Sequence, residues 1–466
     1  MLNKANRHKE RKVKRVLTIA GSDSGGGAGI QADLKTITLL GCYGMSVLTA
    51  LTAQNTCGVE AIYSISPDFV EKQLDTVLSD IGADAAKTGM LDNPDIVKAV
   101  AKKIRKYKIL NLIVDPVMVA KSGHRLLRPE AEESLINELI PLALIVTPNL
   151  PEAEVITGEK VESVDQMEKA AQTIHKLGCK YVLVKGGHLS GDTLVDVLFD
   201  GSDIYHFESK RHKTQNTHGT GCTYSAAIAT FVAQGENVVD AITKAKKFID
   251  QAILFSLSIG KGKGPTNPYR VVARDWERYR VIESLKSAVT ILKNAGPVTH
   301  VFPEVQSNLA YSLPMPLNHD DVAAFPGRFV RLGKEFTVVK DPEFGASRHM
   351  ANVILTAAKF KPEMRSVMNI RYNEYTVRKC LELGFTVAKF DRKDEPESIK
   401  EKEGSTLSWG VAEAIKHSNT FPDIIYDIGE VGKEPMIRVL GTTPENVVNK
   451  VIQIAKATLQ SLPGSS

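Results

Sequence analysis

Short apolar stretches alternate with longer amphipathic stretches along the first half of the chain. The short stretches are rich in β-branched residues, which is typical of buried strands, and apolar residues recur every three or four positions in the longer ones, which is typical of helices. Strands are predicted at residues 16–20, 47–51, 112–114, 144–146, 181–184 and 195–199, and the clearest helices at residues 94–107 and 164–177. Strands that alternate with helices indicate an α/β fold with a largely parallel sheet.

A glycine segment at residues 216–223 precedes a run of small residues that predicts another helix. Gly219 and Gly221 allow consecutive backbone N–H groups to approach a ligand, and the N-terminus of a helix carries a partial positive charge. We therefore expect an anion site here. Cys222 falls in the first turn of the helix, where the same field favours the thiolate. The alternative is a tight turn followed by a small buried cysteine.

Polar residues follow three of the predicted strands, at the edge where ligands collect in parallel sheets. Asp115, Asn149, Glu152 and Lys185 are therefore expected to share one rim. Carboxylate and amide oxygens suit Mg²⁺, and lysine binds phosphate as a point charge, which together favour phosphoryl transfer. Each residue could instead cap a strand end for structural reasons. The chain has neither the P-loop pattern nor the spacing of a dinucleotide-binding fingerprint.

The composition narrows the class of protein. The chain has 466 residues and a formal net charge of +5, but residues 1–15 contain seven Lys or Arg and one Glu. We therefore interpret residues 1–14 as a basic, disordered tail and expect no nucleic-acid partner. The five cysteines are scattered and odd in number, which favours a reduced, cytoplasmic protein over a disulfide-linked or zinc-binding one. No apolar run is long enough to span a membrane, so we expect no membrane association.

A breaker run rich in Gly, Lys and Pro at residues 260–268 indicates a domain boundary. We predict a first domain at residues 15–268, a linker and helix start at 269–284, and a second, smaller α/β domain at 285–462. Apolar residues on one helical face open this second domain. They are Ile282, Leu285, Val289 and Leu292.

Seven blocks occur in order in the first domain, at residues 21–36, 50–56, 87–91, 115–118, 149–153, 185–188 and 216–222. Together they closely resemble hydroxymethylpyrimidine/phosphomethylpyrimidine kinases of thiamine biosynthesis. The resemblance implies a ribokinase-like fold and two successive phosphorylations, first of the hydroxymethyl group of the pyrimidine and then of the resulting monophosphate. ATP would be the co-substrate and Mg²⁺ the cofactor.

The same resemblance implies roles for individual residues. The pyrimidine pocket would be lined by Gly21, Asp33, Gln54, Met90 and Val117. ATP and its phosphates would be bound by Asn149, Glu152, Lys185, Thr217, Gly219 and Gly221, and the metal by Asp115 and Glu152. Cys222 would take the proton of the attacking oxygen, with Lys185 and Asp115 as the other catalytic residues.

Five segments of the second domain, at residues 304–309, 324–328, 344–349, 369–372 and 427–430, resemble the ThiN-type thiamine-phosphate synthase domain. That domain joins the pyrimidine diphosphate to a thiazole phosphate and releases diphosphate. Arg328 and His349 match the catalytic positions, and phosphate would be bound by Arg328 together with Asn308, Arg348 and Arg371. Without the resemblance, these arginines would be interpreted as surface ion-pair residues.

The leading hypothesis is therefore a bifunctional transferase of thiamine synthesis that takes hydroxymethylpyrimidine, ATP and thiazole phosphate. Two alternatives stay open. In one, the second domain binds thiamine phosphate without turnover; in the other, the first domain is a pyridoxal-type vitamin kinase. We also expect a homodimer, by analogy with ribokinase-like proteins.

Overall fold

The computed structural model describes residues 13–118, 129–397, 406–430 and 432–459. Nearly all of the predicted basic tail, residues 1–14, therefore lies outside the described residues. The chain folds into two compact units, Met1–Ala273 and Arg274–Ser466, with most contacts made within each unit. Each unit has its own hydrophobic core, so the two are described separately.

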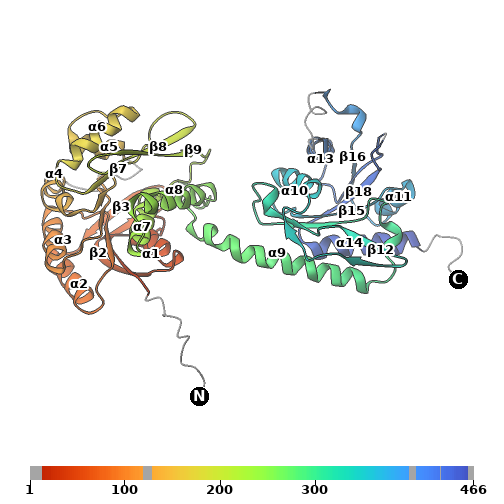
Figure 1. Ribbon diagram of the computed structural model, residues 1–466, viewed down its shortest axis with the longest axis horizontal. Helices are drawn as coiled ribbons and strands as arrows, with labels where there is room; N and C mark the ends of the chain where they lie inside the picture. Colours follow the sequence, from red (N-terminus) through yellow and green to blue (C-terminus); the bar gives the residue numbers. More distant parts are fainter. Residues whose placement is uncertain (1–12, 119–128, 398–405, 431, 460–466) are drawn as a thin grey trace, which may run out of the picture. The chain divides into compact units, whose positions relative to one another are not determined.

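In the described part of the first unit, nine strands form a single sheet (Figure 1). Their order is β3 (Val59–Ser64), β2 (Tyr43–Gln54), β1 (Arg15–Asp23), β4 (Ala85–Thr88), β5 (Leu112–Val114), β6 (Ile145–Val146), β7 (Tyr181–Val184), β8 (Thr193–Phe199) and β9 (Ile204–Lys210). The strands from β2 to β7 run parallel. Antiparallel pairs add β3 at one edge and β8 and β9 at the other.

Helices cover both faces of this sheet because successive residues of each strand point to opposite sides. The core that contains Leu17 joins the sheet to α2 (Pro67–Asp80), α3 (Pro94–Tyr107) and α6 (Val164–His175), on the face where α4 (Pro129–Ser134) and α5 (Leu150–Thr157) also lie. Val16 packs on the other face, with α1 (Gly29–Leu39), α7 (Thr220–Ala233) and α8 (Val238–Leu254). The predicted mostly parallel sheet flanked by helices is confirmed.

Strand β4 was not predicted from the sequence. It carries Lys87 between small residues, so it lacks the apolar run that marks the other central strands. The predicted strand at 16–20 corresponds to β1 and that at 47–51 to β2, and both are longer than expected.

The second unit is also α/β, but its sheet is mostly antiparallel. Seven strands of its described part pair in the order β14 (Glu343–Phe344), β11 (Val322–Ala324), β10 (Leu309–Ser312), β15 (Ser366–Arg371), β18 (Met436–Gly441), β17 (Ile424–Asp427) and β16 (Val387–Lys389). A hairpin, β12 (Phe329–Leu332) and β13 (Glu335–Val338), lies apart from that sheet. This confirms the predicted second, smaller α/β region.

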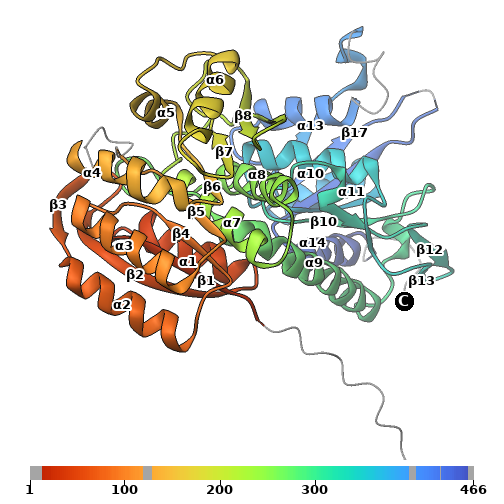
Figure 2. The ribbon, with the colours of Figure 1, turned by 60° about the vertical axis from the view of Figure 1, so that its left-hand side comes forward.

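Helices cover both faces of the second sheet as well (Figure 2). One core joins α9 (Pro268–Asn294), α11 (Glu374–Glu382) and α14 (Pro444–Leu459), and the other joins α10 (Arg348–Phe360) and α13 (Thr406–Lys416). The boundary between the two compact units falls inside α9. Residues 269–284, which were predicted as a linker and helix start, all belong to this helix. None of the described helices is long and apolar enough to cross a membrane.

Candidate active site

A cavity of about 150 Å³ lies at the carboxyl ends of the central parallel strands of the first unit. Predicted site residues that line it are Gly21, Gln54, Met90, Asp115, Val117, Asn149, Glu152, Lys185, Gly219, Gly221 and Cys222. These residues come from seven separate stretches of the chain, and the sheet brings them to one rim because parallel strands end at the same edge. Two predicted residues, Asp33 and Thr217, are not among the lining residues.

Lys185 and Asp115 form an ion pair at the base of this rim, with 2.7 Å between Nζ and Oδ1. Thr147 also donates to Oδ1, and Ser225 donates to Oδ2. Burial alone would raise the pKa of Asp115, but Lys185 and Lys87 outweigh burial and lower it. The carboxylate is therefore held in its ionised form.

Asn149 and Glu152 cap the N-terminus of α5 reciprocally. Glu152 N donates to Asn149 Oδ1 over 2.9 Å, and Asn149 N donates to Glu152 Oε2 over 2.8 Å. This capping box explains why an Asn-x-x-Glu spacing occurs at this strand end. Burial raises the pKa of Glu152 to about 7, with Lys185 opposing the shift and Asp115 adding to it. The carboxyl is thus poised to ionise near neutral pH.

Gly219 and Gly221 shape the start of α7. Gly219 is the N-cap residue with φ of 75°, and a Cβ atom built on it would lie 1.8 Å from the carbonyl oxygen of Gly27. A Cβ atom built on Gly221 would lie 3.5 Å from Lys185 Nζ and 3.6 Å from Asp115 Oδ2. The helix N-terminus therefore faces the ion pair. This arrangement suits a transferring phosphate, since Lys185 and the helix N-terminus both favour negative charge.

The environment of Cys222 differs from the sequence-based expectation. It lies in the first turn of α7 and lines the cavity, as predicted. However, burial raises the pKa of Cys222 to about 11; Lys87 opposes the shift, and Asp33 and Asp115 reinforce it. The prediction of a favoured thiolate is therefore wrong, because loss of hydration and two carboxylates outweigh the helix N-terminus.

Asp33 lies beneath the cavity rather than on its wall. It is fully buried, accepts a hydrogen bond from Thr18 and is paired with Lys87. Lys87, which does line the cavity, was not predicted as a site residue. The signal was available, since Lys87 opens one of the seven sequence blocks. Thr217 lies just outside the lining, where its carbonyl oxygen accepts a hydrogen bond from Thr220.

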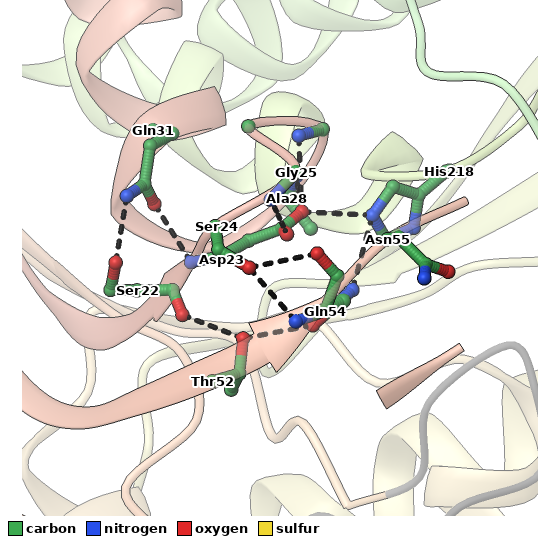
Figure 3. Close-up of polar contacts among 12 residues, drawn as sticks. Ser22, Asp23, Ser24, Gly25, Ala28, Gln31, Thr52, Gln54, Asn55 and His218 are labelled. Carbon is green, nitrogen blue, oxygen red and sulfur yellow. Dashed lines mark hydrogen bonds and ion pairs between the residues drawn. The ribbon is translucent and has the colours of Figure 1, made fainter. Parts of the chain in front are cut away.

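Two further lining residues, Asp23 and His218, were also missed. They contact each other, and His218 also contacts the side chain of the predicted substrate residue Gln54 (Figure 3). Both belong to the glycine-rich blocks, in which the glycines were the clearest signal and these polar side chains were overlooked. Among the described residues, no group of three or more His, Cys, Asp or Glu side chains is placed to hold a metal ion.

The predicted residues of the second unit have different environments. Arg328 has φ of 61° and donates to the carbonyl oxygen of Val305. Asn308 is buried, and its amide donates to Phe325 O over 3.0 Å and accepts from Phe325 N over 3.1 Å. Because both ends of the amide are used by the backbone, its predicted role as a phosphate ligand is not supported. Asn308 instead ties the start of β10 to Phe325.

His349 lies in the first turn of α10, close to several cations. Desolvation by the surrounding protein lowers the pKa of His349, and the positive charges of Arg328, Lys433, Arg438 and Arg392 lower it further. The charge of Arg328 therefore acts on His349, together with the charges of three basic residues that were not predicted. Arg348 begins α10 and Arg371 ends β15; both are exposed, and the structure records no hydrogen bond from either to His349.

Comparisons with known proteins cover both units. A family model described as phosphomethylpyrimidine kinase matches residues 23–267, and one described as thiamine-phosphate synthase ThiN matches residues 284–453. A hydroxymethylpyrimidine/phosphomethylpyrimidine kinase of Bacillus subtilis is 46% identical over 258 residues, which are 55% of this chain and 95% of that protein.

Two relatives that are named as bifunctional match just over half of the chain. The bifunctional protein ThiED of Geobacter sulfurreducens is 54% identical over 252 residues, 54% of this chain and 51% of that protein. The chain therefore spans about half the length of this relative. Among solved structures, an ADP complex of Bacillus subtilis pyridoxal kinase is 43% identical with a TM-score of 0.53, covering 56% of this chain and 98% of that one. These matches confirm the ribokinase-like fold of the first unit.

Proposed function

The chain belongs to the phosphomethylpyrimidine kinase family and carries a ThiN domain behind the kinase domain, and on that premise we propose the reactions that it carries out. The first unit phosphorylates 4-amino-5-hydroxymethyl-2-methylpyrimidine and then its monophosphate, with ATP as donor. The observation that carries this proposal is the Lys185–Asp115 pair facing the N-terminus of α7 across the cavity. Lys185 and the α7 amides stabilise the negative charge of the transferring phosphate.

The pyrimidine end of the cavity is the part lined by Gln54, Met90 and Val117. The amide of Gln54 both donates and accepts, which suits an aminopyrimidine edge, and Met90 and Val117 supply apolar walls. The hydroxymethyl group of a pyrimidine bound there is directed toward Cys222 and the anion site. Gly21 contributes space, because a Cβ atom built on it would lie 3.4 Å from Met90 Sδ.

A divalent cation, Mg²⁺ by preference, is expected to act with ATP by neutralising phosphate oxygens. Glu152 and Asp115 fit such an ion as partners through water, since Mg²⁺ keeps much of its hydration. Direct binding by Asp115 fits less well, because Lys185, Thr147 and Ser225 already donate to its two oxygens. Glu152, whose carboxylate accepts from the backbone N–H groups of Asn149 and Met118 and makes no direct ion pair with any residue that the structure describes, is the better candidate.

Cys222 has different tasks in the two phosphorylations. The hydroxymethyl oxygen must lose a proton, whereas a phosphate monoester is already largely ionised near neutral pH. Because burial raises the pKa of Cys222 to about 11, the thiol is protonated before substrates bind. Cys222 can accept the substrate proton only from its thiolate form, so its own proton must first leave to solvent. It should therefore matter more for the first step than for the second.

The second unit joins the pyrimidine diphosphate to thiazole phosphate. Breaking the bond to diphosphate builds negative charge on the leaving group, and cations placed there favour the transition state. Arg328 and Lys433 contribute to such a field, whereas Arg392 and Arg438 are both paired with Asp427. His349, with its lowered pKa, is neutral near pH 7 and is able to accept a proton.

The test is a coupled assay with hydroxymethylpyrimidine, ATP, Mg²⁺ and thiazole phosphate. Thiamine phosphate is expected as the product, and Cys222→Ala is expected to block the first phosphorylation while Arg328→Ala blocks only the condensation. Accumulation of pyrimidine diphosphate by the wild-type chain without thiamine phosphate would refute the synthase activity. Calorimetric binding of thiamine phosphate without turnover would then favour the non-catalytic alternative.

Pyridoxal phosphorylation is a second candidate activity, because solved pyridoxal kinases share this fold at 43% and 39% identity. Gln54 and Met90 favour the pyrimidine. Comparison of kcat/KM for the two substrates decides between them, and a higher value for pyridoxal would overturn the main proposal. The expected homodimer is tested separately, by light scattering of the purified chain.

A further inference from the structure

The loop that joins β1 to α1 is folded around one carboxylate, that of Asp23. The side chain accepts hydrogen bonds from Gly25 N over 2.8 Å, Gly27 N over 3.0 Å and Ala28 N over 2.7 Å. Burial would raise the pKa of Asp23, but the hydrogen bonds from His218 and Ala28 N outweigh it and lower the pKa. Asp23 is therefore ionised, and an ionised carboxylate only accepts hydrogen bonds.

His218 holds this loop against the start of α7. Its Nε2 lies 2.9 Å from Asp23 Oδ2, and a Cβ atom built on Gly27 would lie 2.4 Å from its ring. The backbone of His218 is fixed as well, because its N–H donates to Gly264 O and its carbonyl accepts from Thr266 N. The imidazole thus has little freedom to turn away from Asp23.

These contacts determine where the ring proton lies. Since Asp23 only accepts, Nε2 of His218 must carry a hydrogen and donate it. A ring nitrogen that carries a hydrogen has no lone pair in the ring plane with which to accept. The same Nε2 lies 3.2 Å from Gln54 Nε2, which is itself a donor. Two donors cannot form a hydrogen bond, so this end of the Gln54 amide is mismatched.

The other end of the Gln54 amide is mismatched for an independent reason. Thr52 donates its hydroxyl hydrogen to Ser22 O over 2.8 Å, so its hydroxyl oxygen can only accept a hydrogen bond from Gln54. Gln54 Oε1 lies 3.3 Å from the same hydroxyl oxygen. Rotation of the amide by 180° exchanges its oxygen and nitrogen and repairs both contacts. The single Nε2 hydrogen of His218 is then shared between Asp23 Oδ2 and Gln54 Oε1 in a bifurcated hydrogen bond, and Gln54 Nε2 donates to Thr52.

We propose that His218, fixed by Asp23, holds the Gln54 amide in this rotated orientation and thereby selects the substrate. The held amide retains one N–H and one lone pair for a ligand. This donor and this acceptor match a substrate ring that presents an acceptor nitrogen beside an exocyclic amino donor, as an aminopyrimidine does. Pyridoxal has no such edge. The inference rests on the proposed function and makes His218 a positioning residue for specificity (Figure 3).

The kinetic test compares His218→Phe with a matched control, His212→Phe. His212 makes a similar ion pair, 2.9 Å from Asp250, and both histidine side chains are 19% exposed, but His212 does not line the cavity. His218→Phe is expected to lower the ratio of kcat/KM for hydroxymethylpyrimidine over pyridoxal by about tenfold, the value of one hydrogen bond to a polar partner. The KM for ATP should change less than about twofold.

A ratio that stays unchanged in His218→Phe, or that falls equally in His212→Phe, overturns the proposal. Thr52→Val removes the second contact of the amide without touching His218, and the same ratio should fall. His218→Gln keeps an N–H donor and should recover part of the selectivity. These variants keep the test decisive if His218→Phe does not fold.

A second measurement does not depend on turnover. Nitrogen-15 spectra of the histidine side chains in the ligand-free chain, assigned with His218→Phe, should show Nε2 of His218 bearing hydrogen. An unprotonated Nε2 overturns the inference whether or not the chain phosphorylates a pyrimidine. Conversely, the expected tautomer with no pyrimidine turnover would refute the proposed function and leave the hydrogen-bond assignment standing.

Discussion

Lys87 Nζ lies 2.9 Å from Asp33 Oδ2, and both side chains are completely shielded from solvent. Thr18 donates a further hydrogen bond of 2.6 Å to the same carboxylate oxygen. Asp115 also acts on Lys87, and its negative charge stabilises the ammonium group. The pair therefore contributes both to the packing beneath the cavity and to the electrostatics of the cavity.

Lys87→Met is expected to destabilise the first unit by roughly 3–5 kcal/mol, because it leaves Asp33 buried without a counter-charge. Lys102→Met is the matched control, since Lys102 forms an exposed pair with Glu71 over 2.9 Å. Circular dichroism during chemical denaturation measures the loss. Both tryptophans, Trp276 and Trp409, lie in the second unit, so their fluorescence should not shift. Equal stability of the two variants would contradict the prediction.

The sequence predicted more of the fold than of the site's electrostatics. Strand ends in a parallel sheet converge by geometry, so Asp115, Asn149 and Lys185 could be placed on one rim from periodicity alone. The partnership of Lys87 with Asp33 could not, because it joins residues 54 positions apart in β4 and α1. The state of Cys222 was also beyond reach, since it depends on burial and on carboxylates contributed by other elements.

The second unit shows the same limit. A motif match marks Asn308 and Arg328 alike, but only the folded chain shows that the amide of Asn308 is used by Phe325. Conversely, Lys433 and Arg438 are far from Arg328 in sequence, and no spacing rule connects them. Side-chain roles in this unit depend on which strands are neighbours, which the periodic pattern leaves open.

Glu152→Gln is expected to change how the stability of the metal-free first unit depends on pH. The pKa of Glu152 rises from 4.5 to about 7 on folding, so the native state holds its proton more tightly than the unfolded state does. Stability is therefore lost as pH rises from about 4.5 to 7, by roughly 3 kcal/mol in all. The variant should be more stable than wild type near pH 8 and no more stable near pH 5.

Denaturation of the chelator-treated protein across this pH range measures the effect of Glu152→Gln. Glu159→Gln, an exposed position just beyond the end of the same helix, serves as control. If both variants follow the wild-type curve, the buried carboxyl is not responsible for the pH dependence.

Alkylation should distinguish the cysteines of the first unit. Cys57 is exposed, whereas burial raises the pKa of Cys222 to about 11. Because the thiolate is the reactive form, iodoacetamide should modify Cys222 about a hundredfold more slowly than Cys57 near pH 8. The rate for Cys222 should also keep rising above that pH. Mass spectrometry of the timed reaction gives both rates, and fast labelling of Cys222 would refute the raised pKa.

Gly219→Ala and Gly158→Ala separate backbone strain from steric exclusion. Their φ values are 75° and 74°, but a Cβ atom at Gly158 meets nothing within 4 Å, whereas one at Gly219 would meet Gly27 O at 1.8 Å. Gly158→Ala should therefore cost only about 1 kcal/mol of stability. Gly219→Ala should cost more and lower kcat at least about tenfold, since the loop and the α7 N-terminus must separate. Comparable losses in both would contradict this account.

Arg328→Ala is expected to lower kcat/KM for condensation about a hundredfold or more, by removing positive charge from the diphosphate site. Formation of the pyrimidine diphosphate should remain within about twofold of wild type. Arg378→Ala, an exposed position in α11, is the control. Separate assays of the two steps with purified intermediates measure both rates, and loss of the kinase step in Arg328→Ala would contradict the division of activities.

The contact between His218 and Asp23 joins residues 195 positions apart. Loops closed over such separations form late, after the local helices and hairpins are in place. While the start of α7 is still inside the ribosome, the nascent chain has the glycine loop that follows β1. It lacks His218, the residue that holds this loop in the folded protein. The proposed pyrimidine site is therefore incomplete until synthesis of this unit is nearly complete.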